Sequence, residues 1–297
     1  MQLAKREKQI AGFVLIGFAV AIIVMATRLG NVNPTRDESP KLETPLRPAL
    51  GFDRNDYPGD EEMAALRRAY AFSSYWLNNP PGANGNSWAG KRNILVENNF
   101  GFLVLFNGRA SKELKSERAA ASLGSSDASA AAASATREGF PKDTVIFLDQ
   151  EEGGRMLPPQ KAYIYAWMDG VKNAGFRAGN YCSAIAVKDG AEEVTTAEDI
   201  RENANGRAIV FWVYNDACPP SAGCVYPPSA PKPSTSGFAL ADVWQFTQSP
   251  RRKELTQRCA ANYDADGNCY PPAESGAGKI FLDLDAATSP DPSHGGG

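Results

Sequence analysis

Residues 144–151 read Thr-Val-Ile-Phe-Leu-Asp-Gln-Glu, with four apolar residues in a row that lead into two carboxylates two positions apart. A short apolar run of this kind is typical of a strand buried on both faces. Side chains on a strand alternate with a period of two, so Asp149 and Glu151 are predicted to point the same way. Their Cα atoms should lie roughly 6.5–7 Å apart. The stretch therefore predicts a buried strand that delivers two acids to one place.

Similar apolar runs recur on both sides of this stretch. They occupy residues 49–53, 74–78, 101–107, 178–182, 208–214, 242–247 and 279–284. Helical periodicity lies between several of them, over residues 61–72 and 159–174 and from Thr196 onward. The Ala/Ser-rich residues 119–136 are interpreted as an exposed outer helix without a functional role.

Eight strands with interleaved helices predict an α/β protein with a (β/α)8 TIM-type barrel, regular or irregular. A doubly wound sheet is the alternative. Its usual phosphate fingerprint, Gly-x-Gly-x-x-Gly after a strand, is absent from the sequence.

Polar side chains close most of the predicted strands. In a barrel the carboxyl ends of the strands meet on one face, where active sites form. Acids and amides at so many ends indicate a site, and aromatic residues there offer flat faces for sugar rings. The candidates are Asp53, Asn78, Asn107, Asp149, Glu151, Tyr181, Trp212, Tyr214, Gln245 and Asp283.

The composition excludes several classes of ligand and of catalytic mechanism. The 297 residues carry a formal net charge of -3, without the basic excess that nucleic-acid binders show. The one histidine, His294, lies at the C-terminus, which argues against Ser-His-Asp catalysis and most zinc sites. Residues 264–268 resemble the start of a calcium loop but lack its terminal Glu. We therefore expect carboxylate chemistry with no metal and no cofactor.

The N-terminal segment indicates export. Lys5, Arg6 and Lys8 precede an unbroken apolar run over residues 10–26, so residues 1–27 are interpreted as a signal anchor or a signal peptide. The cationic start should stay in the cytoplasm, which places the rest outside. Residues 28–48 are a Pro-rich linker, residues 49–288 the barrel and residues 289–297 a flexible tail.

The five cysteines fit an oxidising compartment. Five cysteines allow 15 arrangements of two disulfides, and the sequence alone does not select one. Loop length favours the pairs Cys218–Cys224 and Cys259–Cys269. Cys182 is then a free thiol that behaves as a small buried hydrophobic residue.

Four motifs in order resemble glycoside hydrolase family 25, the Chalaropsis-type lysozymes, and the related glycoside-hydrolase-like domains of secreted bacterial proteins. Residues 51–53 resemble the family's opening Gly-Ile-Asp, and residues 147–151 its Asp-x-Glu strand. Residues 243–247 resemble its Trp-Gln-Tyr-Thr strand, and residues 282–285 its closing Val-Asp-Leu-Asn. Departures occur in Arg54-Asn55-Asp56 and in Glu152-Gly153-Gly154, each directly after a matching motif.

The resemblance implies a lysozyme- or muramidase-like glycoside hydrolase. Glu151 would be the proton donor, and the other acidic residues of the site would be Asp149, Asp53 and Asp283. Asp149 would orient a substrate acetamido group or stabilise the oxocarbenium-like transition state. Retention and inversion of the sugar configuration both remain open.

The leading functional prediction is an exported hydrolase, in the periplasm or at the cell surface, that cleaves a cell-wall glycan such as peptidoglycan. The alternatives are a non-catalytic glycan-binding protein on the same barrel and an envelope scaffold. The expected partners are cell-wall polysaccharide and, through the N-terminal helix, the membrane. No nucleic acid is expected to bind, and the chain is expected to be a monomer.

Overall fold

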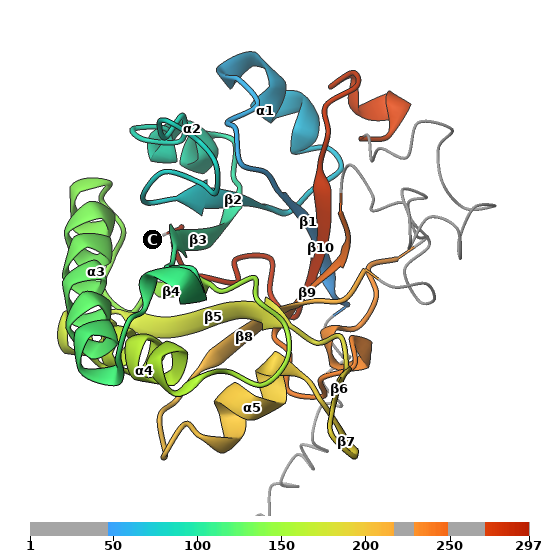
Figure 1. Ribbon diagram of the computed structural model, residues 1–297. Coiled ribbons are helices and arrows are strands. Elements are labelled where there is room, and N and C mark those ends of the chain that lie inside the picture. Colours follow the sequence, from blue (N-terminus) through green and yellow to red (C-terminus); the bar gives the residue numbers. More distant parts are fainter. Residues whose placement is uncertain (1–46, 217–228, 249–270, 297) are drawn as a thin grey trace, which may run out of the picture. The chain divides into compact units, whose positions relative to one another are not determined.

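The computed structural model describes residues 47–216, 229–248 and 271–296 (Figure 1). The strands are β1 (Ala49–Asp53), β2 (Phe72–Trp76), β3 (Gly101–Asn107), β4 (Val145–Asp149), β5 (Arg177–Ser183), β6 (Val187–Asp189), β7 (Glu192–Val194), β8 (Val210–Tyr214), β9 (Val243–Thr247) and β10 (Asp283–Ala287). The α-helices are α1 (Asp60–Leu66), α2 (Arg92–Glu97), α3 (Glu117–Arg137), α4 (Pro158–Asn173) and α5 (Thr196–Glu202). Short 3₁₀ turns are η1 (Ser111–Glu113), η2 (Pro233–Thr235) and η4 (Ala273–Ser275).

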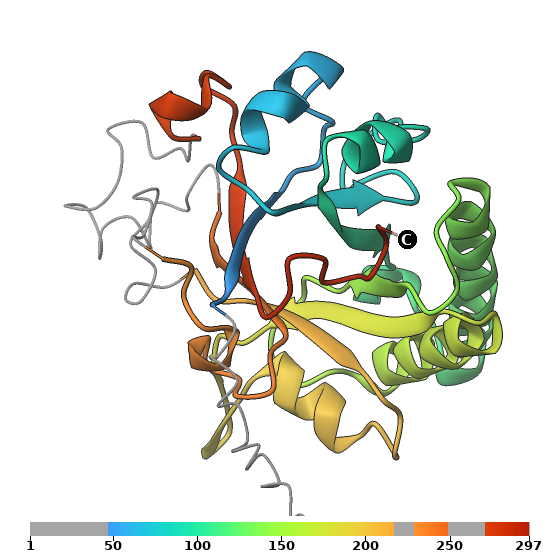
Figure 2. The same cartoon turned by 180° about the vertical axis from the view of Figure 1, so that it is seen from behind.

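Eight strands close into a barrel in the order β1-β10-β9-β8-β5-β4-β3-β2 (Figures 1 and 2). This closure confirms the predicted α/β barrel. The barrel is irregular at one strand, because β10 runs antiparallel to both of its neighbours, β1 and β9. The other neighbouring strands pair in parallel. The first residue of β10 therefore lies at the same rim as the last residues of the parallel strands.

Aromatic residues and glycines share the barrel interior. Phe147 on β4 packs edge-on against Trp212 on β8, with ring centroids 5.7 Å apart. A Cβ atom at Gly179 would lie only 2.5 Å from the Phe147 ring, so the glycine makes room for that ring. These side chains thus pack the barrel interior below the rim.

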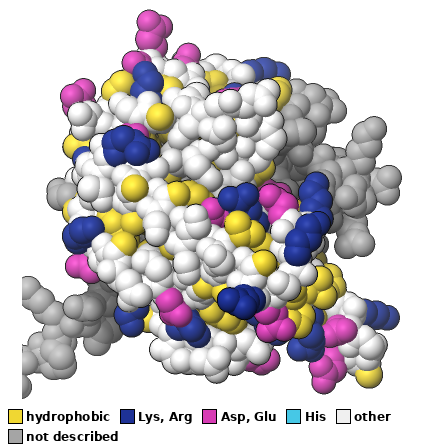
Figure 3. All heavy atoms as spheres, turned by 60° about the vertical axis from the view of Figure 1, so that its left-hand side comes forward, with side chains coloured by type: hydrophobic (Ala, Val, Ile, Leu, Met, Phe, Trp, Pro, Cys, Tyr) yellow, Lys and Arg dark blue, Asp and Glu magenta, His cyan; other side chains and the backbone are white. Residues whose placement is uncertain are grey.

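Helices α3 and α4 pack closely along one side of the barrel (Figure 2). The helix predicted over residues 119–136 is confirmed, but one face of it is buried. Buried small residues, among them Ala128 and Ala131, let the two backbones approach. A Cβ at Gly124 would lie 2.2 Å from the Tyr163 carbonyl oxygen. On the described surface turned forward in Figure 3, basic and acidic side chains are interspersed.

The C-terminal segment corrects one expectation. Residues 289–296 are predicted to be a flexible tail, yet they pack under the starts of β3 and β4. The Ser293 side chain is fully buried, and its hydroxyl accepts a hydrogen bond from the Val104 amide at 2.9 Å. Asp291 accepts one from the Phe102 amide at 2.9 Å. The segment is held because it supplies acceptors for amides at the amino ends of the strands.

Other differences concern boundaries. The last strand begins at Asp283 rather than at Lys279, and α1 ends at Leu66 rather than at Phe72. Helix α2 and the β6–β7 hairpin are additional elements that the sequence patterns did not indicate.

Several sequence predictions lie outside the described residues. They are the N-terminal apolar run, most of the linker, Cys218, Cys224, Cys259, Cys269 and residues 264–268. In the described part of the chain, no helix is long and apolar enough to cross a membrane. Cys182 is free and buried, as predicted.

Candidate active site

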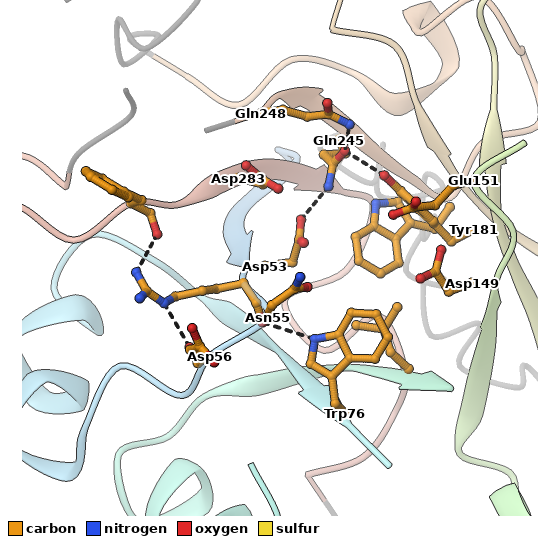
Figure 4. A pocket seen from close by; sticks show the side chains of 14 residues that line it. Asp53, Asn55, Asp56, Trp76, Asp149, Glu151, Tyr181, Gln245, Gln248 and Asp283 are labelled. Atoms are coloured by element: carbon orange, nitrogen blue, oxygen red, sulfur yellow. Dashed lines mark hydrogen bonds between the residues drawn. The ribbon is translucent and has the colours of Figure 1, made fainter. Parts of the chain in front are cut away.

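A cavity of about 290 Å³ opens at the rim where the parallel strands end. Its walls come from strands and loops around the whole barrel. It is lined by Asp53, Arg54, Asn55, Asp56, Trp76, Leu105, Asp149, Glu151, Tyr181, Trp212, Gln245, Gln248, Phe281 and Asp283 (Figure 4). Seven of the ten residues predicted for a site are among them, including all four predicted acids.

Asp53 and Asp283 meet because β1 and β10 are antiparallel neighbours. They are paired directly across the two strands, the last residue of β1 opposite the first of β10. In a fully parallel barrel the first residue of a strand would lie at the opposite end from this cavity. The reversed direction of β10 is therefore what brings Asp283 to the site.

Asp149 and Glu151 approach from β4 and from the loop that follows it. Asp149 is buried, with 6% of its surface exposed, and its Oδ1 atom has no hydrogen-bond partner among the described residues. Glu151 lies past the end of the strand and is exposed. The Tyr214 hydroxyl donates to the Glu151 backbone oxygen at 2.7 Å. Tyr214, predicted to bind substrate, thus fixes the main chain beside the cavity.

Gln245 links the polar groups of the cavity floor (Figure 4). Its Nε2 donates to Asp53 Oδ2 at 2.7 Å. Its Oε1 accepts from the Tyr181 hydroxyl at 2.8 Å and from Gln248 Nε2 at 2.9 Å. Burial raises the pKa of the Tyr181 phenol well above its usual value, so Tyr181 stays a neutral donor. These bonds fix the Asp53 carboxyl in one orientation.

Among the described residues, no lysine or arginine forms an ion pair with Asp53, Asp149 or Glu151. Among the described residues that line the cavity, Arg54 is the cation, but its Nε and Nη1 atoms donate to the backbone oxygens of Asp56 and Phe281, both at 2.9 Å. Burial raises the pKa of Asp53 to about 6. Burial and the charges of Glu151 and Asp53 raise the pKa of Asp149 well above its usual value. The cluster therefore retains protons at a pH where ordinary carboxyl groups are ionised.

Glu151 is the accessible acid of this cluster. Burial raises its pKa as well. No described side chain hydrogen-bonds to its carboxyl group. A carboxyl group with a raised pKa, open to the cavity and free of internal hydrogen bonds, is suited to transfer a proton to a bound molecule.

The neighbouring Glu152 has a structural role. Its carboxylate accepts hydrogen bonds from the Ser111 amide at 3.0 Å and the Ser111 hydroxyl at 2.8 Å. It also accepts from Gln160 at the start of α4. Glu152 therefore ties the β4–α4 loop to the turn after β3, and it does not line the cavity.

Asn78 and Asn107 lie apart from the acids. They line a separate shallow hollow over the ends of β2 and β3, together with Arg109 and Asp127. Asn78 Nδ2 donates to the Asn107 carbonyl oxygen at 3.0 Å, and the Asn107 amide donates to Asn78 Oδ1 at 2.8 Å. These bonds use the Asn78 side chain and the Asn107 backbone, and the Asn107 side chain donates to the Asn79 carbonyl oxygen at 3.0 Å, so both asparagines help to join the two strand ends.

Sequence reasoning missed one buried acid of the site, Asp285. It is fully buried and accepts a hydrogen bond from Trp212 Nε1 at 2.9 Å. The available signal was the spacing, because Asp283 and Asp285 are two positions apart on one strand and share a face. Among the described residues, no cluster of His, Cys, Asp or Glu is arranged to hold a metal ion.

One family model matches part of this chain. The family model described as Rv2525c-like, glycoside hydrolase-like domain matches residues 89–217. This stretch runs from the segment before α2 to the end of β8 and includes Asp149 and Glu151. The match confirms the predicted resemblance to glycoside-hydrolase-like domains. No curated protein matches the chain significantly.

Three of the solved structures that are similar to this chain illustrate the likeness. A protein of B. stearothermophilus is 20% identical, with 80% of this chain and 95% of that chain covered and a TM-score of 0.49. The Mycobacterium tuberculosis Tat-secreted protein Rv2525c is 14% identical, with 82% and 96% covered and a TM-score of 0.48. The catalytic domain of endolysin ply40, from bacteriophage P40 of Listeria monocytogenes, is 14% identical, with 84% and 98% covered and a TM-score of 0.46.

Proposed function

We propose that this chain is an exported glycoside hydrolase that cleaves a cell-wall glycan, in the first place peptidoglycan. The observation that carries the proposal is the acidic cavity at the rim of a glycoside-hydrolase-like barrel, where an exposed carboxyl group stands beside a buried one. Hydrolysis of a glycosidic bond needs a pair of carboxyl groups and no histidine or metal.

Glu151 acts as the general acid. It reaches the cavity from a loop that Tyr214 holds by the backbone, so its carboxyl group can turn toward a bound sugar. Its raised pKa favours the protonated form that a general acid needs. The proton passes to the leaving glycosidic oxygen as its bond to the anomeric carbon breaks, and the oxygen of a water molecule finally bonds to that carbon in its place.

Asp149 orients the substrate. Its Oδ1 atom is buried without a partner among the described residues, which costs free energy unless a ligand supplies a hydrogen bond. Burial and the charges of Glu151 and Asp53 raise the pKa of Asp149 well above its usual value, which favours the neutral form. A neutral carboxyl group can both donate and accept a hydrogen bond. An acetamido group has one N–H and one carbonyl oxygen and matches this carboxyl group.

Release of reducing ends from purified peptidoglycan tests the proposal. Glu151→Gln keeps the size of the side chain but removes the transferable proton, so it should lower the rate roughly 10²–10⁴-fold. Binding of insoluble glycan should stay nearly unchanged. Glu193→Gln, the same change at an exposed residue of β7, serves as the matched control and should cleave at the wild-type rate.

Two outcomes would overturn the proposal. If Glu151→Gln cleaves as fast as the wild type, the acid lies elsewhere. If the wild-type protein binds wall material but releases no reducing ends, the chain is a glycan-binding protein and not a hydrolase.

Export is the second part of the proposal, and it rests on the cationic start and the apolar run of residues 10–26. The barrel should be digested by protease that is added to intact spheroplasts. If the barrel is protected from the protease, the chain is not exported. The two predicted disulfides would then lose their support, because they depend on an oxidising compartment.

A further inference from the structure

Asp285 is the most deeply buried acid beside the cavity. It lies on β10, where its backbone pairs with Gly51 on β1 and with Gln245 on β9. Its side chain is fully buried, whereas Asp283, two positions earlier, is partly exposed at the rim. In the described part of the chain, no lysine or arginine forms an ion pair with Asp285. An ionised carboxylate in this position would be unusually unfavourable.

The two oxygens of Asp285 have different surroundings. Oδ1 accepts a hydrogen bond from Trp212 Nε1 at 2.9 Å. Oδ2 is buried and has no donor among the described residues. The carboxyl group is instead in hydrogen-bonding contact with the Asp53 carboxyl group. Two ionised carboxylates only accept hydrogen bonds, so this contact requires one proton between them.

The surroundings indicate which of the two acids holds that proton. Asp53 also receives the Nε2–H of Gln245 at 2.7 Å, which favours its charged form. Asp285 also receives one N–H, from Trp212 at 2.9 Å. It is fully buried, however, whereas Asp53 is 7% exposed and lines the cavity, so a charge is less favourable on Asp285. Burial and the charges of Asp53 and Asp283 raise the pKa of Asp285 well above its usual range, while that of Asp53 rises to about 6.

The described acids outside this pair that act on it disfavour a second charge. Asp283 acts on Asp285 along β10, and Glu151 acts on Asp53 across the cavity. The charge of Asp53 also acts on Asp149. The only described cation at the cavity, Arg54, is turned toward backbone oxygens.

We propose that Asp285 is a positioning residue that is protonated at neutral pH and donates a hydrogen bond from its Oδ2 atom to the Asp53 carboxylate. Asp53 is then held ionised between two donors, Gln245 and Asp285. The inference deepens the proposed function, because it assigns the charge state in which Asp53 faces the substrate.

The charge state can be measured without an activity assay. In the full-length protein labelled with ¹³C at aspartate carboxyl carbons, the Asp53 signal is identified by its loss in Asp53→Asn and titrated by NMR. If Asp285 is neutral, Asp285→Asn changes no charge, and Asn Nδ2 donates to Asp53 in its place. The Asp53 midpoint should then stay within about half a pH unit of the wild type.

Glu151→Gln is the matched control for this titration. It makes the same acid-to-amide change at a residue whose charge raises the pKa of Asp53, so the Asp53 midpoint should fall measurably. If Asp285→Asn lowers the midpoint by a full unit or more, Asp285 is ionised in the wild type and the proposal is wrong. The carboxyl signal of Asp285 is the one that disappears in Asp285→Asn. If this signal titrates below pH 5 in the wild-type protein, the proposal is also wrong.

Removing the donor tests the positioning role. Asp285→Leu leaves Asp53 with Gln245 alone, so the Asp53 midpoint should rise by roughly one unit. With peptidoglycan as the substrate, Asp285→Asn should keep its activity within about threefold of the wild type. Asp285→Leu should lose about tenfold or more, and the acidic limb of its pH–rate profile should move to higher pH. Loss of activity in Asp285→Asn that is as large as in Asp53→Asn would overturn the positioning role. If the wild type is inactive, the proposed hydrolysis fails, while the titration still decides the charge state.

Discussion

At the scale of single residues, the charge of Asp53 depends on where the chain places it. The side chain is 7% exposed and receives one hydrogen bond from Gln245 that favours the ionised form. Burial outweighs that bond and raises its pKa from 3.8 to about 6. An acid whose pKa is raised by folding binds its proton more tightly in the folded state than in the unfolded chain.

This shift predicts a loss of stability as pH rises. The contribution of Asp53 is fully present below the unfolded pKa near 4 and is lost as pH rises through about 6. Asp53→Asn removes the titration, so its free energy of unfolding relative to the wild type should increase between pH 4 and pH 7. A shift of about two units corresponds to at most about 3 kcal/mol. Urea unfolding at a series of pH values measures the difference.

The control for this measurement is Asp56→Asn, at an exposed residue of the same rim. Its stability relative to the wild type should show no comparable rise over the same pH interval. A flat difference for Asp53→Asn would mean that Asp53 is ionised in the folded protein as easily as in the unfolded chain.

At the scale of elements, α3 and α4 illustrate how small residues set a distance between helices. Composition alone suggested an exposed helix, since alanine and serine occur at most positions of residues 119–136. In the structure, Gly124 lies against the α4 backbone at Tyr163, and Gly170 lies against Ala128. The buried face consists of small side chains because larger ones would push the helices apart.

Gly124→Ala should therefore destabilise the protein. Alanine is favoured over glycine in a helix by about 1 kcal/mol. The added Cβ, however, would lie 2.2 Å from the Tyr163 carbonyl oxygen, and overpacking of this kind costs about 1–3 kcal/mol. We expect a net loss of about 1 kcal/mol in urea unfolding.

The exposed Ser126 on the same helix provides the comparison. Ser126→Ala should be neutral or slightly stabilising, because it gains helix propensity without a new contact. If Gly124→Ala is as stable as Ser126→Ala, the two helices can separate at little cost and the close approach is not required.

At the scale of the whole molecule, two features complete the barrel. The antiparallel β10 closes the gap between β1 and β9 and carries Asp283 and Asp285 to the cavity. At the other end, residues 289–296 bond to the starts of β3 and β4. The Asp291 carboxylate accepts from the amides of Phe102, Gly295 and Gly296 at 2.9–3.1 Å.

Asp291→Ala should lower the free energy of unfolding by about 1–3 kcal/mol, because it leaves amides without their acceptor. Asp291→Asn keeps one acceptor oxygen and should lose less. A chain that ends at Thr288 should lose more than either, since it also removes Ser293 from the amide of Val104. Thermal and urea unfolding rank the three variants. Equal stability of the wild type and the shortened chain would contradict a structural role for the segment.

The sequence by itself determined the class of fold and most of the acids of the site. Apolar runs such as residues 101–107 and 144–149 indicate buried strands without any knowledge of the neighbours, because a strand that is covered on both faces contains few polar residues. The Asp149–Glu151 spacing likewise predicted two acids at one rim. Asp149 is the last residue of β4 and Glu151 follows in the loop, so both lie at that rim although the alternation of the strand ends before Glu151.

Only the tertiary structure decided the direction of β10, the separation of Asn78 from the acids, the burial of residues 289–296 and the role of Asp285. Each depends on partners far away in the sequence, such as Asp53 opposite Asp283 or Trp212 beside Asp285. A short strand has the same local pattern in either direction, so its orientation is set by pairing with its neighbours. The charge of a buried acid is likewise set by the groups that folding places around it.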